Sequence, residues 1–316
     1  MPLRIVFFGT PAFAVPTLER LFASHDVVAA VTQPDRPRGR GHRLQPSSVK
    51  SAAAGRVPVL QPTKLSDPAW LAALNDLRPD LGVVAAYGRI LPQSLLDLPR
   101  LGMVNVHASL LPRWRGAAPV HRAVLAGDRE TGVTIMRVVL ALDAGPMLAA
   151  RSTEIAPDET SGELETRLAS MGAELLAETV DRLAAGTVAG TAQDERFATY
   201  ASRLERQESQ INWQRPAAAI HNQIRGLQPW PLAAARLQGR RVLLLRSQVA
   251  DERQSAAAPG VVERVERDAL LIAAVPGLVR LTEIQMEGRS PVRVREFLHG
   301  RPVRVGERFE PLPADE

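Results

Sequence analysis

Strand-like apolar runs alternate with helical stretches along the first half of the chain, and this alternation limits the possible folds more than any other feature. The runs lie at 4–8, 27–32, 81–86, 103–107 and 133–139. Helical patterns separate them, for example at 70–77 and 117–125. Strands that alternate with helices are typical of a parallel sheet with helices on both faces. We therefore expect an α/β fold with a doubly wound, mostly parallel, Rossmann-like sheet.

A long amphipathic helix follows this region. Thr160 and Glu163 have the spacing of a capping box, and apolar residues then recur on one helical face. The next stretch, 187–206, is polar and has no apolar periodicity, which is typical of a surface linker. We therefore divide the chain into a first domain over 1–186, this linker, and a second domain over 207–316.

The second domain contains several short β-like runs. They lie at 233–237, 241–245, 261–265, 270–274 and 278–283. Gly-Arg, Arg-Asp and Pro-Gly pairs punctuate them, and short strands joined by such turns favour a small β-barrel.

Composition excludes several classes of protein. The chain has no cysteine, which removes disulfide scaffolds, thiolate nucleophiles and zinc-thiolate sites. Its longest apolar runs fall far short of the roughly 20 residues that a bilayer span needs, and its start lacks the three regions of a secretory signal. We expect a cytoplasmic protein with no membrane partner.

The formal net charge of +5 comes almost entirely from arginine, because Lys50 and Lys64 are the only lysines. Most of the excess lies beyond residue 200. Arginine forks match phosphate oxygens, so a phosphate-rich partner is one interpretation. A solvated surface in an organism that encodes arginine in preference to lysine is the other.

The turn after the first strand argues against nucleotide cofactors. It reads Gly9-Thr10-Pro11-Ala12 and contains one glycine, so it fits neither G-x-G-x-x-G nor the P-loop. A tight turn into a helix explains it, and we expect neither NAD nor ATP.

Three polar residues could carry chemistry. Asn105 and His107 are two apart on a predicted strand, so they project to one face near the edge where open α/β sheets bind ligands. An amide can donate to a developing oxyanion, and an imidazole can move a proton near neutral pH. Asp143 lies in a loop after another strand and could orient the imidazole. By themselves these residues are also consistent with a purely structural role.

A resemblance to a known family rests on seven stretches, spread in order over residues 4–231. They read RIVFFGTPAFA from 4, TQPDRPRGRGHRL from 32, AAYGRILP from 85, GMVNVHASLLPRWRGAAP from 102, TGVTIM from 131, LDAG from 142 and IRGLQPWP from 224. With these stretches the chain resembles the folate-dependent formyltransferases, and specifically those that act on methionyl-tRNA. One loop departs: the family commonly reads Gly-Leu-Asp-Thr-Gly-Asp where this chain has Ala-Leu-Asp-Ala-Gly-Pro at 141–146, with the aspartate retained.

The resemblance implies a reaction and its residues. A formyl group would pass from 10-formyltetrahydrofolate to the amino group of methionyl initiator tRNA, without metal or nucleotide, and the second domain would be an OB-like tRNA-binding barrel. Asn105, His107 and Asp143 would be catalytic. The residues expected to bind folate are Ser109, Leu110, Leu111 and Pro112, together with Tyr87, Gly88, Ile90 and Leu91. A plain strand-to-helix turn would look similar to the second group. We expect a monomer.

Four arginines, Arg36, Arg38, Arg40 and Arg43, stand on a Gly/Pro-containing loop after the second predicted strand. Such a charge run is usually a solvated face. The resemblance implies instead that this loop enters the acceptor end of tRNA, and its Gly-Arg-Gly arginine aligns with Arg40. Arginine planes can also stack on unpaired bases.

Two alternatives remain open. The same catalytic residues could formylate a small amine, as in glycinamide ribonucleotide or sugar-nucleotide formyltransferases, although the arginine loop favours a large anionic acceptor. The chain could also be a non-catalytic RNA-binding protein built on an enzyme scaffold. The presence of Asn105, His107 and Asp143 together argues against this alternative.

Overall fold

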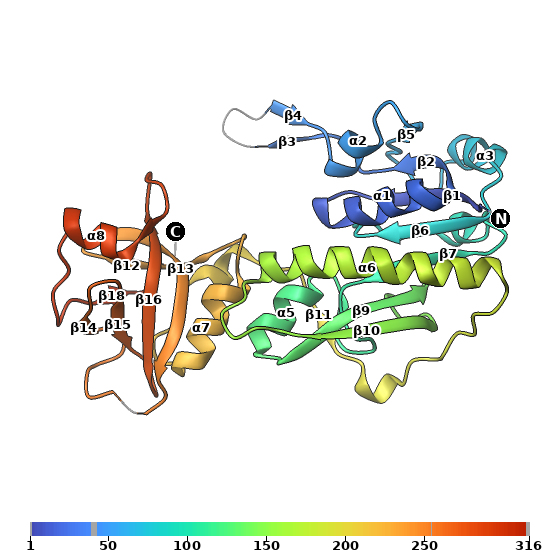
Figure 1. The fold of residues 1–316 in the computed structure, drawn as a ribbon. Helices are drawn as coiled ribbons and strands as arrows, with labels where there is room; N and C mark the ends of the chain where they lie inside the picture. Colours follow the sequence, from blue (N-terminus) through green and yellow to red (C-terminus); the bar gives the residue numbers. More distant parts are fainter. Residues whose placement is uncertain (1, 39–42, 254, 314–316) are drawn as a thin grey trace. The chain divides into compact units, whose positions relative to one another are not determined.

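The structure of the chain is a computed structural model that describes residues 2–38, 43–253 and 255–313 (Figure 1). The chain forms two compact units, and it passes between them more than once. The first unit comprises Met1–Pro119, Thr131–Thr153 and Glu165–Ala201, and the second comprises Val120–Glu130, Glu154–Leu164 and Ser202–Glu316. Each unit is described by itself.

A seven-stranded sheet forms the centre of the first unit. Its strands are β1 (Arg4–Gly9), β2 (Asp26–Val31), β5 (Val59–Leu60), β6 (Leu81–Ala85), β7 (Met103–His107), β9 (Glu130–Arg137) and β10 (Met147–Glu154). They lie in the order β10-β9-β7-β6-β1-β2-β5. The pairs from β7 to β5 are parallel, whereas β9 runs antiparallel to β7. The predicted doubly wound, mostly parallel sheet is confirmed.

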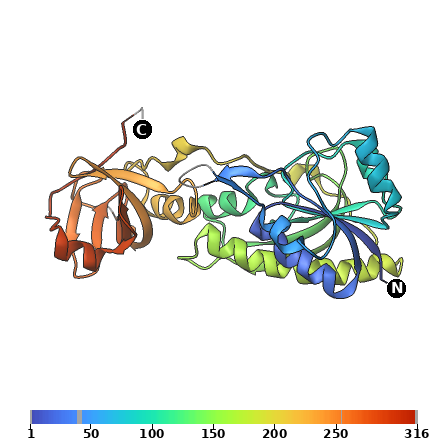
Figure 2. The same cartoon turned by 90° about the horizontal axis from the view of Figure 1, so that it is seen from above.

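Helices cover both faces of this sheet. They are α1 (Val15–Ser24), α2 (Ser48–Ala53), α3 (Pro68–Asp76), α4 (Gln93–Leu96) and α6 (Ser161–Ala184), with a 3-10 turn η1 (Ala12–Ala14) before α1. Leu74 of α3 and Leu95 of α4 join the core cluster of one face, together with Phe8 of β1. Gly172 of α6 lies against Val106 on the opposite face. Figure 2 shows α1 and α6 on one side of the sheet and α3 on the other.

The start of α6 follows from its sequence. The backbone N–H of Thr160 donates to Glu163 Oε2 at 2.9 Å, and the N–H of Glu163 donates to Thr160 Oγ1 at 3.3 Å. This reciprocal pair satisfies two N–H groups that have no partner within the helix. The predicted capping box is confirmed.

A closed antiparallel barrel forms most of the second unit. Its strands are β12 (Ala233–Leu237), β13 (Arg240–Asp251), β14 (Val262–Val265), β15 (Leu270–Ala273), β16 (Leu278–Met286), β17 (Val292–Arg293) and β18 (Phe309–Glu310), in the order β14-β15-β16-β13-β12-β18 with β17 beside β16. An antiparallel bridge between Val261 and Arg308 joins the two ends of this order. The expected OB-like barrel is confirmed.

Helices pack with the barrel in the second unit. The helices are α5 (Pro119–Ala126), α7 (Ala217–Gly226) and α8 (Val294–Gly300). Ile220 and Ile224 of α7 are fully buried in the barrel core. None of the helices in the described part of the chain is long and apolar enough to cross a membrane.

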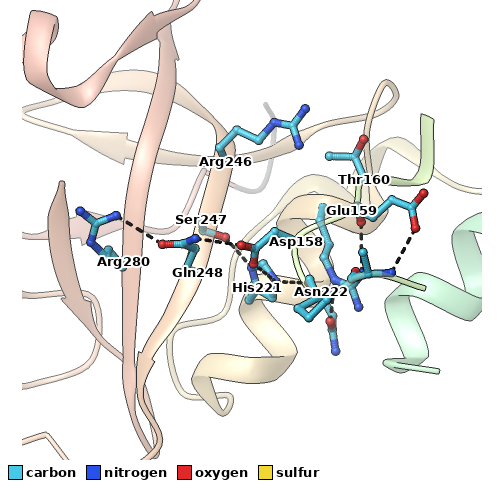
Figure 3. Close-up of polar contacts among 12 residues, drawn as sticks. Asp158, Glu159, Thr160, His221, Asn222, Arg246, Ser247, Gln248 and Arg280 are labelled. Carbon is cyan, nitrogen blue, oxygen red and sulfur yellow. Dashed lines mark hydrogen bonds and ion pairs between the residues drawn. The ribbon is translucent and has the colours of Figure 1, made fainter. Parts of the chain in front are cut away.

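The segment Glu154–Leu164 is tied to α7 and β13 by the polar contacts in Figure 3. His221 Nε2 donates to the carbonyl oxygen of Pro157 at 2.9 Å, so Nδ1 accepts from the Ser247 hydroxyl at 3.0 Å. Gln248 Nε2 donates to Asp158 Oδ2 at 2.8 Å. Burial lowers the pKa of His221, which fits a neutral imidazole with both nitrogens paired.

The stretch 187–206 is divided between the two units at residue 201. Its first part contains the turn η2 (Glu195–Phe197) and the strand β11 (Tyr200–Ala201), which pairs in parallel with β8 (Arg115–Gly116). The second part contains the turn η3 (Arg206–Ser209). The division of the chain into 1–186, a linker and 207–316 stays a prediction.

Candidate active site

The candidate site is built on the carboxyl end of β7. Side chains alternate along a strand, so Met103, Asn105 and His107 lie on one face, and Val106 points to the other face, where α6 packs. Met103 belongs to the core cluster of its face. Asn105 and His107 follow it toward the end of the strand, where parallel sheets bind ligands.

His107 is buried, with 5% of its surface exposed. Its Nε2 lies 2.9 Å from the carbonyl oxygen of Trp114. A carbonyl can only accept, so Nε2 carries a hydrogen and donates. Nδ1 lies 3.7 Å from Asp143 Oδ2, beyond the usual hydrogen-bond range. Nε2 is thus engaged with the backbone, and Nδ1 faces a carboxylate.

Asp143 occupies an unusual backbone conformation. Its φ is 48°, in the left-handed region that costs a non-glycine residue roughly 1 kcal/mol. Its Oδ2 accepts a hydrogen bond from the backbone N–H of Gly116 at 2.8 Å. Strained residues of this kind cluster at functional sites. The bend directs the carboxylate of Asp143 toward His107.

Hydrogen bonds with two hydroxyl groups hold the segment 109–113, which follows β7, in a tight turn. Thr134 of β9 donates to the carbonyl oxygen of Ser109 at 2.7 Å and accepts from the N–H of Leu111 at 3.1 Å. Ser109 Oγ donates to the carbonyl oxygen of Arg113 at 2.6 Å. Ser109 and Leu111 are buried, whereas Leu110 and Pro112 are half-buried. Of the expected folate residues in this segment, Leu110 and Pro112 are thus the more accessible.

The turn after β6 carries the other expected folate residues. The Tyr87 ring is buried edge-on against Phe8, with ring centroids 5.6 Å apart, and burial raises its pKa. Its carbonyl oxygen accepts from Gln33 Nε2 at 2.8 Å. Gly88 is exposed at a φ of 78°, and Ile90 is 80% exposed. Leu91 is buried. Of the expected folate residues in this turn, Gly88 and Ile90 are thus the accessible ones, and Tyr87 and Leu91 are buried.

The predicted arginine loop is a hairpin of β3 (Arg36–Arg38) and β4 (Arg43–Gln45). Arg36 is exposed and donates to Gln33 Oε1 at 3.0 Å. Arg38 and Arg43 are paired through their backbones. Arg40 lies outside the described residues. Lys50, 2.6 Å from Asp35, holds the base of the hairpin.

Two features escaped the sequence reasoning. Strand β11 pairs with β8, and the N–H of Trp114 donates to Thr199 Oγ1 at 2.9 Å. The polar composition of this stretch gave no signal, because it lacks apolar periodicity.

Among residues 2–38, 43–253 and 255–313, no three His, Cys, Asp or Glu side chains gather as candidate metal ligands.

Comparison with known proteins identifies the family. The Formyl transferase family matches residues 3–180, and its C-terminal domain matches residues 203–302. A methionyl-tRNA formyltransferase from Pseudomonas paraeruginosa is 46% identical over 301 residues, covering 95% of this chain and 96% of that protein. A methionyl-tRNA formyltransferase from Methylococcus capsulatus is 48% identical over 299 residues, covering 94% and 96%. This chain belongs to the methionyl-tRNA formyltransferase family.

Solved structures show the same fold at lower identity. An N-formyltransferase from Helicobacter canadensis, in complex with folinic acid and dTDP-3-aminofucose, superposes with a TM-score of 0.68 at 19% identity, covering 90% of this chain and 99% of that one. HypX from Aquifex aeolicus, in complex with tetrahydrofolic acid, gives 0.65 at 17% identity, covering 94% and 47%. The fold of this chain is thus shared with an N-formyltransferase and with HypX.

Proposed function

We propose that this chain transfers the formyl group of 10-formyltetrahydrofolate to the amino group of methionine esterified to initiator tRNA, and that Asn105, His107 and Asp143 carry the transfer. The observation that supports this proposal is the meeting of His107 Nδ1 and Asp143 Oδ2, 3.7 Å apart, beside Asn105 at the carboxyl end of β7. The product is N-formylmethionyl-tRNA, which serves translation initiation.

The attacking group needs little activation. An α-amino group has a pKa near 8, so an appreciable fraction is neutral near pH 7. The neutral amine adds to the formyl carbon, and the carbonyl electrons move onto oxygen. The main demand on the protein is therefore to stabilise that oxyanion and to move protons.

Asn105 and His107 meet this demand together. The amide of Asn105 and the Nδ1–H of protonated His107 are the donors for the oxyanion. One such donor is worth about 3 kcal/mol in related acyl-transfer sites. Asp143 holds the imidazole in place, and the three groups pass the proton of the amine to N10 of the folate as the C–N10 bond breaks.

The folate would lie against the two turns that end β6 and β7. A flat pterin ring needs an apolar surface together with a few fixed backbone hydrogen-bonding groups. Exposed Ile90 and Gly88 offer both on one turn, and half-buried Leu110 and Pro112 offer apolar surface on the other. Tyr87, Leu91, Ser109 and Leu111 would support these turns from beneath.

The tRNA would be held by its phosphates and its acceptor end. In this proposal Arg36, Arg38, Arg40 and Arg43 engage the acceptor end, and the barrel of the second unit follows the backbone. A substrate of this size accounts for the arginines of the hairpin that follows β2 in the chain. We place the reaction in the cytoplasm and expect the enzyme to act as a monomer.

The deciding experiment is an acceptor panel with 10-formyltetrahydrofolate as donor. The acceptors are charged initiator methionyl-tRNA, charged elongator methionyl-tRNA, free methionine and glycinamide ribonucleotide. Strong preference for the charged initiator is expected. Transfer to a small amine alone would retain the active site and overturn the acceptor, and tRNA binding without any transfer would favour a non-catalytic RNA-binding protein.

The catalytic assignment is tested in the same assay. His107→Ala and Asp143→Ala should each lower kcat by roughly 100-fold or more, because a positioned acid or base contributes about that much. tRNA binding and the thermal unfolding midpoint should stay near the parent values. Unchanged turnover in either variant would remove that residue from the mechanism.

A further inference from the structure

The stretch before η2 returns to the candidate site through one side chain. Gln193 is half-buried, and its Nε2 donates to the carbonyl oxygen of Asp143 at 2.8 Å and to that of Gly145 at 2.8 Å. Both acceptors lie in the loop that presents the Asp143 carboxylate to His107. The amide of Gln193 thus holds the backbone of this loop at two residues, Asp143 and Gly145.

Arg115 fixes the orientation of that amide. Its guanidinium, on a residue only 2% exposed, donates through Nε and Nη2 to Gln193 Oε1 at 3.0 and 2.8 Å. With the oxygen held by a cation, the Nε2 group must point to the two carbonyls. Nη1 and Nη2 of Arg115 also donate to Glu195. The side chain of Gln193 therefore has one arrangement in which all its contacts are made.

The bend that Gln193 holds is the one that orients Asp143. At a φ of 48° this residue would relax toward ordinary backbone conformations without such restraint. The loop also passes closely over β9, since a Cβ on Gly145 would lie 1.9 Å from the carbonyl oxygen of Arg137. Arg115 is followed by Gly116, whose N–H donates to Asp143 Oδ2. The backbone of Asp143 is thus held by Gln193, which Arg115 orients, and its carboxylate is held by Gly116, the residue after Arg115.

We propose that Gln193 is a positioning residue for catalysis, which holds the Asp143 loop in its reactive conformation. This inference rests on the proposed function, because it takes Asp143 as a group that acts in formyl transfer. Gln193 itself touches no reacting atom.

Gln193→Glu is the most specific test of this positioning role. A glutamate of the same length keeps the contact with Arg115, but it offers only oxygen atoms to the carbonyls of Asp143 and Gly145. We expect kcat to fall roughly 10- to 100-fold, since small displacements of a reacting group cost about that much. KM for both substrates should stay within about twofold. Gln193→Ala removes the donors without adding a charge, and should lower kcat in the same way if the glutamate variant fails to fold.

Glu195→Gln is the matched control. It changes another partner of Arg115 on the same stretch, and it leaves the Gln193 amide intact. We expect its kcat to match the parent. Equal losses of kcat in Gln193→Glu and Glu195→Gln, accompanied by lower thermal midpoints, would mean that the stretch only stabilises the fold, and would overturn the inference.

A double variant separates this inference from the proposed function. In an Asp143→Asn background, measured under single-turnover conditions, Gln193→Glu should cost little further activity, because the group it positions is already altered. Additive losses would contradict a role through Asp143. If Asp143→Ala itself retains full turnover, the catalytic assignment fails; if Asp143→Ala is inactive while Gln193→Glu is fully active, only the positioning role fails.

Discussion

Gly116 and Asp143 are joined by a hydrogen bond of 2.8 Å from a backbone N–H to a carboxylate oxygen, and this contact depends on the absence of a side chain at Gly116. Gly116 has a φ of 115°, and a Cβ there would lie 2.8 Å from the carbonyl oxygen of Ala201. That carbonyl accepts from the N–H of Ala117, next to Gly116, so it cannot withdraw easily. The position of the Gly116 N–H, which donates to Asp143, is therefore fixed by the close approach of the backbones at Gly116 and Ala201.

Gly116→Ala should lower both stability and turnover. We expect the free energy of unfolding to fall by about 1–3 kcal/mol from backbone strain alone, and kcat to fall because the N–H of residue 116 moves away from Asp143. Gly55→Ala is the control, since Gly55 has a φ of 73° with no neighbour within 4 Å of a Cβ. Denaturant unfolding and steady-state kinetics measure both effects. Loss of stability without loss of kcat in Gly116→Ala would contradict the role of this hydrogen bond.

Asn105→Ala should act on the chemical step. Removing one oxyanion donor costs about 100- to 1,000-fold in kcat in comparable sites, and we expect a loss of this size with little change in KM for either substrate. Asn105→Asp keeps the size of the side chain but loses the amide donor, so it should be equally impaired. A rise in KM with unchanged kcat would instead mean that Asn105 binds substrate equally in the ground and transition states.

The arginine hairpin should govern tRNA engagement. Arg36→Ala and Arg40→Ala should raise KM for charged tRNA and leave KM for the folate unchanged. Each should reduce the slope of log affinity against log salt concentration by about one if the arginine contacts a phosphate. Arg20→Ala is the control, because Arg20 is an exposed arginine near the end of α1, which leads back to the amino end of the sheet. If folate KM changed with the hairpin variants, the hairpin would belong to the folate site.

Acid should destabilise the second unit through His121. Burial, and then the positive charge of Arg122, lower the pKa of His121 to about 4. The unfolded chain takes up this proton near pH 6.5, so the free energy of unfolding should fall as the pH drops from about 6.5 to about 4, by at most on the order of 1.4 kcal/mol per pH unit. His121→Gln should flatten this dependence, although His221 of the same unit, whose pKa burial also lowers, would retain part of it.

His299→Gln is the control for this pH dependence. His299 is an exposed histidine on α8, in the same unit. If His299→Gln changed the slope of unfolding free energy against pH as much as His121→Gln, the effect would not be specific to His121. A slope that is unchanged in His121→Gln would show that His121 does not hold its proton differently in the folded and unfolded chains.

The sequence by itself determined the local structure of the chain and the family to which it belongs. Alternating apolar runs predicted the parallel sheet, and the spacing of Thr160 and Glu163 predicted the start of α6, because periodicity and capping act over a few residues. The spacing of Asn105 and His107 placed both on one face of β7, since a strand alternates with period two. The motif stretches led to the formyltransferase family, which the comparisons confirmed.

Only the tertiary structure decided what reaches the site from far along the chain. The sequence placed Gln193 in a featureless polar stretch, because a contact between one amide and two distant carbonyls leaves no periodic pattern. It placed Tyr87 among folate residues without showing that the ring is buried against Phe8. The approach of Nδ1 of His107 to Oδ2 of Asp143 depends on a left-handed bend held by Gly116 and Gln193. Such a bend is set by packing and hydrogen bonds between strands, and not by the preference of its own residues.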